Sequence, residues 1–124
     1  MIEFKPCASK KIYELLGRTD IAEGIIGYTA FEGGKETGYC VCKIEDTFVR
    51  IILLQFSDET PYIGEGLIKS ALNFAAGKGA YIAICSQEVK KNHVLPFGFN
   101  PSKDGYTGEI PEILMGKCHK FGNL

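Results

Sequence analysis

The sequence lacks an excess of charge of one sign, a long hydrophobic run and an export signal. Its 14 basic and 15 acidic residues give a formal net charge of −1, with both signs scattered along the chain. This pattern predicts neither a nucleic-acid-binding surface nor a basic membrane-binding patch. The longest apolar run, interrupted by Arg50, is about half of the ~20 residues that a membrane-spanning helix needs, and the residues from Met1 to Lys5 lack a signal-peptide pattern. We therefore expect a cytoplasmic protein that binds neither nucleic acid nor membrane.

The chain also lacks the C-x-x-C spacing that is typical of zinc sites. It has five cysteines, an odd number without an export signal, which favours free thiols in a reducing compartment. Cys40 and Cys42 fall on one face of a predicted strand, and Cys118 with His119 would supply further ligands to a zinc ion. The alternative for these thiols, and for Cys85, is a role as small buried side chains. We favour that alternative and expect no metal site.

No repeat or low-complexity segment is found, and 124 residues suit one domain spanning 1–124. Alternating or continuous apolar residues predict strands, helical spacing predicts helices, and Gly, Asn and Asp pairs predict turns. The predicted elements are a strand at 1–7, a helix at 10–17 capped by Ser9, hairpin strands at 25–32 and 37–44, a central strand at 47–56 covered on both faces, a helix ending near 78 and a strand at 80–85.

The helix that ends near Lys78 connects two apolar strands of a length that predicts a crossover, so these two strands should be parallel. Its buried stripe is predicted to contain Leu67, Ile68, Ala71, Leu72, Ala75 and Ala76. Residues 87–95 predict a short helix that Pro96 interrupts, and the segment from Phe97 to Met115 predicts a closing hairpin. The expected fold class is α/β, with a mixed sheet of an antiparallel meander plus a parallel strand pair and with flanking helices.

Between the two parallel strands, a tight loop that opens a helix is predicted for the stretch Pro61-Tyr62-Ile63-Gly64-Glu65-Gly66-Leu67. Two glycines spaced by one residue leave the backbone unshielded, so its free N–H groups can face an anion at the positive end of the helix dipole. No Ser, Thr, Asp or Asn stands at Ile63 or Gly64 to cap the helix. Lys69 stands where a dinucleotide-binding motif has its third glycine. We expect a phosphate-binding loop in which a side chain at Gly66 would obstruct the anion.

The order of these elements resembles that of the GNAT N-acetyltransferase superfamily over nearly the whole chain. In that family the loop carries Gln/Arg-x-x-Gly-x-Gly/Ala. Gly64 and Gly66 match its two glycines, whereas Pro61 replaces the Gln or Arg. Further along the chain, Gly98-Phe99 matches a Gly-Phe pair of the family. The resemblance implies a GNAT-like sheet and acetyl-coenzyme A as the co-substrate.

The resemblance also implies the residues that would bind this cofactor. The loop amides would hold the diphosphate, and the end of the central strand would pair with the pantetheine arm in a cleft where the parallel strands splay apart. The implied residues are Leu54, Gln55 and Phe56 of the strand, Ile63, Gly64, Glu65, Gly66 and Leu67 of the loop, and Gln87, which stands where the family usually has an Asn. Three acidic residues flank the loop and three lysines can compensate for their charge: Asp58, Glu59, Glu65, Lys69, Lys90 and Lys91.

Two catalytic groups of the family are replaced in this sequence. Val94 stands at the position of the tyrosine that often protonates the leaving thiolate, and valine has no ionisable group. Tyr62 and His93 are the candidates to take over its role. The family commonly has a carboxylate on the central strand to deprotonate the amine, and residues 47–56 contain none. Asp58 and Glu59 follow directly, and a solvated turn is the favoured interpretation for both.

The leading functional hypothesis is transfer of an acetyl group from acetyl-coenzyme A to an amine of a small molecule or peptide, which the sequence does not identify. The alternative is a catalytically degenerate GNAT-fold protein that acts as an acyl-coenzyme A-binding or protein-interaction module. The segment before Ile25 is short for the family, in which two helices shape the acceptor pocket there. The pocket is therefore expected to be open, or to be completed by a second subunit in a homodimer.

Overall fold

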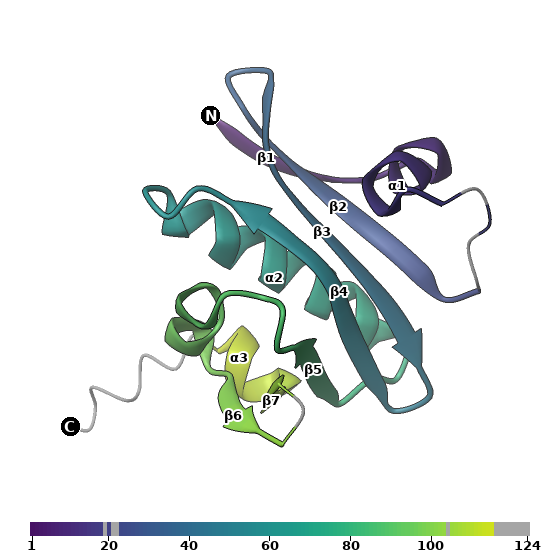
Figure 1. Cartoon of the computed structure of the whole chain (residues 1–124), viewed down its shortest axis with the longest axis vertical. Coiled ribbons are helices and arrows are strands. Elements are labelled where there is room, and N and C mark those ends of the chain that lie inside the picture. The colour runs from purple at the N-terminus through teal and green to yellow at the C-terminus, as the bar shows by residue number, and fades with distance from the viewer. Residues whose placement is uncertain (19, 21–22, 104, 116–124) are drawn as a thin grey trace.

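The computed structural model describes residues 1–18, 20, 23–103 and 105–115, and its centre is a mixed β-sheet (Figure 1). In chain order the elements are β1 (Ile2–Pro6), α1 (Ser9–Leu16), β2 (Ile25–Glu32), β3 (Lys35–Glu45), β4 (Phe48–Phe56), α2 (Pro61–Gly77), β5 (Ile82–Ser86), η1 (Lys91–His93), η2 (Leu95–Phe97), β6 (Asn100–Ser102), β7 (Gly105–Glu109) and α3 (Ile110–Leu114). The strands of this sheet lie in the order β1-β2-β3-β4-β5-β7-β6.

The strands β1 to β4 form the predicted antiparallel meander. Gly33 and Gly34 connect β2 to β3 with φ angles of 63° and 85°, a region that glycine adopts without a steric penalty. Asp46 turns the chain from β3 into β4 with a φ of 53°, and aspartate is among the few other residues that tolerate this region. The meander was predictable because turn residues separate its apolar runs.

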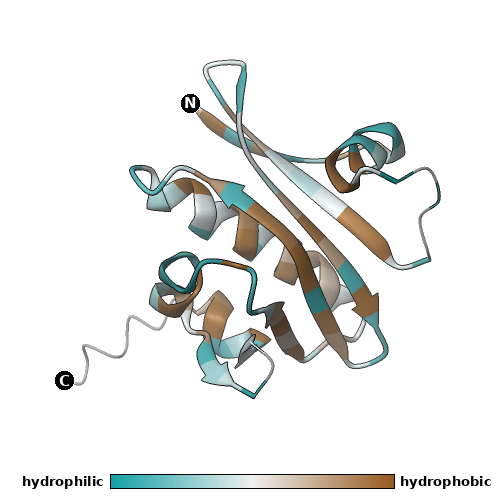
Figure 2. Cartoon of the chain, viewed as in Figure 1, coloured by the Kyte–Doolittle hydropathy of each residue, from teal (hydrophilic) through white to brown (hydrophobic). Residues whose placement is uncertain are grey.

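The helix α2 connects β4 to β5, and these two strands are parallel, as predicted. Its buried residues are Ile63, Gly64, Leu67, Ile68, Ala71, Leu72 and Ala75. They pack on strand residues that include Cys40, Val49, Ile51, Leu54 and Ala83, and hydrophobic residues recur along β4 and α2 in Figure 2. Ala76 is exposed rather than part of the stripe. Burial of this face stabilises α2.

The opposite face of the sheet carries α1 over β2. A Cβ atom at Gly27 of β2 would lie 3.2 Å from the side chain of Ile12 on α1, so a larger residue there would require Ile12 to shift by a few tenths of an ångström. Ser9 is the first helical residue rather than the cap, because Ala8 occupies the N-cap position. The prediction that the central strand is covered on both faces is wrong, since Ile52 of β4 is 38% exposed. The single short helix α1 leaves this part of the sheet face open.

The C-terminal region departs from the prediction in two places. In place of a short helix at 87–95, the chain makes a turn and two single 3₁₀ turns, η1 and η2. The strands β6 and β7 form a hairpin, and β7 pairs antiparallel with β5. The apolar segment after this hairpin is the helix α3 rather than a strand. Pro111 lacks the N–H that a strand would need, and Ile110 and Ile113, three residues apart, are both buried.

The cysteines that the structure describes are free thiols. Cys40 and Cys42 are buried with their sulfur atoms 3.7 Å apart, and burial is the main cause that raises the pKa of the Cys85 thiol. In residues 1–18, 20, 23–103 and 105–115, no group of three or more His, Cys, Asp or Glu side chains is placed to hold a metal ion. Cys118 and His119 lie outside the described residues. No helix in the part of the chain that the structure describes is long and apolar enough to cross a membrane.

Candidate functional site

The candidate site begins where β4 and β5 separate. β3 pairs with β4 along most of its length, from Phe48 to Phe56, whereas the pairing of β4 with β5 ends at Ile51↔Cys85. A register shift follows directly, because Val41 of β3 pairs with Leu53 and the next pair is Cys42↔Ile51, which leaves Ile52 as an extra residue in β4. Such a bulge bends and twists its strand. The bend therefore coincides with the point at which the parallel strands separate.

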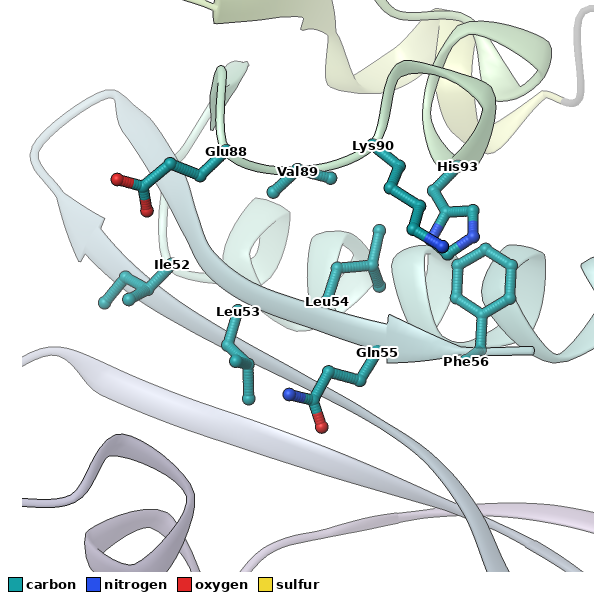
Figure 3. Close-up of a pocket in the computed structure, with 9 residues that line it drawn as sticks. All are labelled: Ile52, Leu53, Leu54, Gln55, Phe56, Glu88, Val89, Lys90 and His93. Atoms are coloured by element: carbon teal, nitrogen blue, oxygen red, sulfur yellow. The ribbon is translucent and has the colours of Figure 1, made fainter. Parts of the chain in front are cut away.

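A cavity of about 370 Å³ occupies the gap between the two strands. Its walls are the last five residues of β4 and the segment that follows β5 (Figure 3). The lining residues are Ile52, Leu53, Leu54, Gln55, Phe56, Glu88, Val89, Lys90 and His93. We call this cavity the β4–β5 cleft. Leu54, Gln55 and Phe56, which the sequence predicted to lie in such a cleft, all line it.

The β4 wall of the cleft presents backbone groups that lack a neighbouring strand. Beyond Ile51, β4 has β3 on one edge, and no strand of the described residues pairs with its other edge. An unpaired strand edge offers N–H and C=O groups to any extended chain that contains amides. The geometry therefore fits a linear ligand with its own amide groups, lying along β4 from Ile52 to Phe56.

The other wall carries the charged side chains of the cleft. It starts at the end of β5, where Ser86 Oγ accepts a hydrogen bond of 3.1 Å from the backbone N–H of Glu88. In Figure 3, Glu88 and Ile52 lie toward one end of the cleft, and Lys90 and His93 lie at the other end beside Phe56. The carboxylate that lines the cleft therefore lies near the point where the strands separate, and the ammonium that lines it lies near the start of α2, where it also contacts Asp58.

His93 is held rigidly in this wall. His93 is only 4% exposed. Its ring stacks on the ring of Phe56 with centroids 3.9 Å apart, and its Nε2 lies 2.5 Å from Oδ1 of Asp58. The hydrogen bond with His93 is the main cause that holds the pKa of Asp58 below its usual value, and the positive charge of Lys90 adds to it. Asp58 is exposed, as expected of a solvated turn, but it also orients His93.

The predicted phosphate-binding loop is wrong as a loop, because α2 already begins at Pro61. The backbone N–H of Thr60 donates a hydrogen bond to the carbonyl of Ser57, and the backbone N–H of Ile63 donates one of 2.9 Å to the carbonyl of Thr60. Pro61 has no N–H. From Gly64 to Leu67 the amides lie within the helix, where they are directed at the carbonyls four residues earlier. Few free amides are therefore left at this helix start for an anion.

The two glycines of the motif accommodate aromatic rings. A Cβ atom at Gly64 would lie 2.2 Å from the ring of Phe56, and one at Gly66 would lie 2.0 Å from the ring of Phe4. The predicted conflict at Gly66 is therefore with the ring of Phe4 on β1. Gly64 lets Phe56 pack between α2 and His93. These glycines shape the wall of the cleft through packing.

The remaining predicted site residues lie outside the cleft. Tyr62 is 46% exposed, and its hydroxyl is 3.5 Å from a carboxylate oxygen of Glu32 on β2. Gln87 is an exposed turn residue and does not line the cavity. Glu65 pairs with Lys69 one helical turn later, at 2.9 Å. Of the two catalytic candidates, the structure therefore brings only His93 to the cleft.

Glu88 is a candidate functional residue that the sequence reasoning missed. It lines the cleft and is the carboxylate near the point where the strands separate. A signal for it existed in the sequence, because it lies shortly after a strand of a predicted parallel pair, and ligands bind beyond the carboxyl ends of such strands.

Comparison with known proteins supports the fold. Neither the protein-family models nor the curated protein sequences contain a match to this chain. A putative GNAT-family acetyltransferase from Desulfovibrio desulfuricans aligns with a TM-score of 0.63 at 11% identity, over 89% of this chain and 99% of its own. The putative N-acetyltransferase YhhK from E. coli, solved bound to coenzyme A, aligns with a TM-score of 0.63 at 11% identity, over 88% of this chain and 98% of its own.

A third similar structure is the ribosomal-protein-S18-alanine N-acetyltransferase from Escherichia coli, with a TM-score of 0.64 at 8% identity, over 88% of this chain and 90% of its own. With a mixed sheet, one parallel strand pair and flanking helices, the chain has the fold of the GNAT N-acetyltransferases.

Proposed function

We propose that this protein transfers an acetyl group from acetyl-coenzyme A to an amine, with the cofactor in the β4–β5 cleft. The observation that carries this proposal is the separation of β4 from β5 after Ile51↔Cys85. It leaves a strand edge beside a cavity of about 370 Å³. The pantetheine arm is a linear chain with two amides, so it can hydrogen-bond to such an edge.

The charges of the cleft favour one orientation of the cofactor. Its anionic diphosphate lies at the end with Lys90, and its thioester then lies near Ile52, at the end with Glu88 (Figure 3). A carboxylate near the thioester attracts a protonated amine and accepts its proton. This arrangement favours an amine that carries a positive charge at neutral pH.

In the proposed reaction, the amine nitrogen attacks the thioester carbonyl carbon, the C–N bond forms and the C–S bond breaks. Glu88 accepts one proton from the ammonium form of the amine before the attack, and the second proton that the nitrogen loses passes through water to the departing thiolate. The hydroxyl of Tyr62 points to the carboxylate of Glu32, and His93 lies at the other end of the cleft. Neither side chain is therefore placed beside the thioester in this orientation. Orientation of the amine by the cleft supplies much of the rate. The predicted catalytic roles of Tyr62 and His93 stay predictions.

Binding and turnover are tested separately. Isothermal titration with acetyl-coenzyme A should show saturable heat, and no heat at millimolar ligand would contradict the proposal. Thiol release against a panel of amines and peptides then measures transfer. Glu88→Gln should lower kcat by about a hundredfold or more, because it removes a general base, with little change in cofactor affinity. Glu59→Gln is the matched control, since Glu59 is an acidic residue outside the cleft.

The second candidate function is an acyl-coenzyme A-binding or protein-interaction module without turnover. The buried aliphatic Val94 at the family's usual tyrosine position favours it, as does the location of Tyr62 outside the cleft lining. Saturable binding of acetyl-coenzyme A, without thiol release for any amine of the panel, would support this candidate over the enzyme.

A further inference from the structure

Three donor side chains converge on the carboxylate of Asp58. Lys90 Nζ lies 3.6 Å from its Oδ2. His93 Nε2 lies 2.5 Å from its Oδ1 and Asn92 Nδ2 lies 3.5 Å from the same oxygen. An ammonium, an amide and an imidazole N–H all donate hydrogen bonds. We call Lys90, Asn92 and His93 the donor turn, and its geometry is that of a site for an oxyanion.

Within the donor turn His93 is buried, whereas Lys90 and the Asp58 carboxylate that it contacts are exposed. The imidazole of His93 is 5% exposed and stacks on Phe56, and its backbone N–H donates to Lys90. The side chain of Asp58 is 55% exposed and lies in the short turn between β4 and α2. Rotation of Asp58 toward solvent would leave the donors in place, with a buried imidazole N–H that needs a new acceptor.

The donor turn lies at the end of the cleft near the start of α2, where few backbone amides are free to bind an anion. The start of α2 has a proline at Pro61 and a backbone bond from Ile63 to Thr60, so it offers little to a diphosphate. Lys90 and His93 line the same cleft from the opposite wall. A diphosphate that follows β4 beyond Phe56 therefore reaches side-chain donors rather than helix amides.

We propose that a phosphate group of coenzyme A takes the place of the Asp58 carboxylate on Lys90, Asn92 and His93. This inference rests on the proposed function. Asp58 is then an internal competitor, which satisfies the donor turn in the absence of cofactor and leaves it when the phosphate binds. The exchange is required because two anions close to one set of donors repel each other.

The first test changes the lysine of the donor turn. Lys90→Gln should raise the dissociation constant for coenzyme A about tenfold, because a charge-assisted contact with a phosphate is lost. Lys91→Gln is the matched control, since Lys91 is an exposed neighbour that is not among the groups contacting Asp58. It should change the constant less than about twofold. Equal effects of the two substitutions would overturn the inference.

The second test removes the competitor. Asp58→Asn keeps an oxygen acceptor for His93 but removes the negative charge, so it should lower the dissociation constant for coenzyme A about three- to tenfold. Glu59→Gln removes the same charge from the next residue without touching the donor turn. An Asp58→Asn effect no larger than that of Glu59→Gln would overturn the proposal.

Pantetheine, which has no phosphate, separates this inference from the proposed function. The wild type, Lys90→Gln and Asp58→Asn should all bind pantetheine with the same affinity. Suppose that the wild type binds coenzyme A, but each substitution changes the affinity for coenzyme A and the affinity for pantetheine by the same factor. The proposed anion site is then wrong, and the assignment of the cleft to the cofactor stands. If the wild type binds neither ligand in the millimolar range, the proposed function is wrong and this inference with it.

Discussion

The two walls of the β4–β5 cleft have different chemistry. The β4 wall consists of apolar side chains and a free backbone edge, and β3 fixes it along most of its length. The opposite wall is a pair of turns that carries Glu88, Lys90 and His93. The first wall sets the shape and direction of a ligand, and the second sets the charge that the ligand must have at each end. The two walls can therefore be altered independently.

The start of α2 packs behind the first wall, against the ring of Phe56. Gly64 and Gly66 receive the rings of Phe56 and Phe4, and the helix amides there are directed at other backbone groups. A glycine motif that suggests phosphate binding thus supports packing, whereas the polar contacts are made by the wall across the cleft. Three substitutions test this division, from the largest expected effect to the smallest.

Gly64→Ala tests whether the glycine motif is needed for packing. The new methyl group would lie 2.2 Å from the ring of Phe56, so the ring must move toward His93 or away from the sheet. We expect the free energy of unfolding to fall by about 1–3 kcal/mol, as measured by urea denaturation.

The control for this substitution is Gly77→Ala at the other end of α2. A Cβ atom at Gly77 would meet no atom within 4 Å, so alanine should raise the free energy of unfolding by up to about 1 kcal/mol. If Gly64→Ala were as stable as the wild type, the ring of Phe56 would not be confined as the structure indicates.

Asp58→Asn tests the charge on the second wall through the pH dependence of stability. The hydrogen bond with His93, and then Lys90, lower the pKa of Asp58 from its usual 3.8. A carboxyl group with a lowered folded pKa stabilises the fold above its unfolded pKa, and this contribution is lost as the pH falls through the folded value. The stability difference between wild type and variant should therefore be fully present above about pH 5 and shrink as the pH falls through 3.8 and below.

Urea denaturation at a series of pH values measures this difference, with Glu59→Gln as the control at the neighbouring residue. If the difference in free energy of unfolding from the wild type changed with pH in the same way for both substitutions, the contacts of Asp58 with His93 and Lys90 would contribute nothing specific to stability.

Lys69→Gln tests whether the cation on α2 contributes to the anion site. Lys69 is paired with Glu65 at 2.9 Å on the surface of the helix, so its loss should lower the free energy of unfolding by only about 0.3–0.5 kcal/mol. The affinity for coenzyme A should not change. A loss of affinity as large as that of Lys90→Gln would place the anion contact on α2 and remove the distinction between the two walls.

Much of the sheet could be predicted because its signals are local. Gly33-Gly34 separates two apolar runs, and the strands on either side pair as the sequence indicates. The crossover through α2 follows from a strand, a helix and a strand in succession. The C-terminal helix α3 was missed, because its apolar run is too short for the helical and strand periods to be distinguished.

The candidate site was less predictable, because its contacts join residues that are far apart in the chain. Asp58 and His93 are separated by 35 positions, and nothing near either residue indicates the other. Glu88 becomes a site residue where β4 and β5 stop pairing, beside the bulge at Ile52. Leu54, Gln55 and Phe56, which the family resemblance implied for such a cleft, line the cavity, and their role in cofactor binding stays a prediction.

The sequence by itself determined the order of the main strands, their directions in the meander and the crossover, and the existence of a glycine-bearing helix start after the central strand. Only the tertiary structure decided what those glycines do. The sequence shows that Gly64 and Gly66 have no side chain, but the space this leaves can admit a phosphate or an aromatic ring. Which one enters depends on the positions of Phe56 and Phe4, and packing between distant segments fixes those positions.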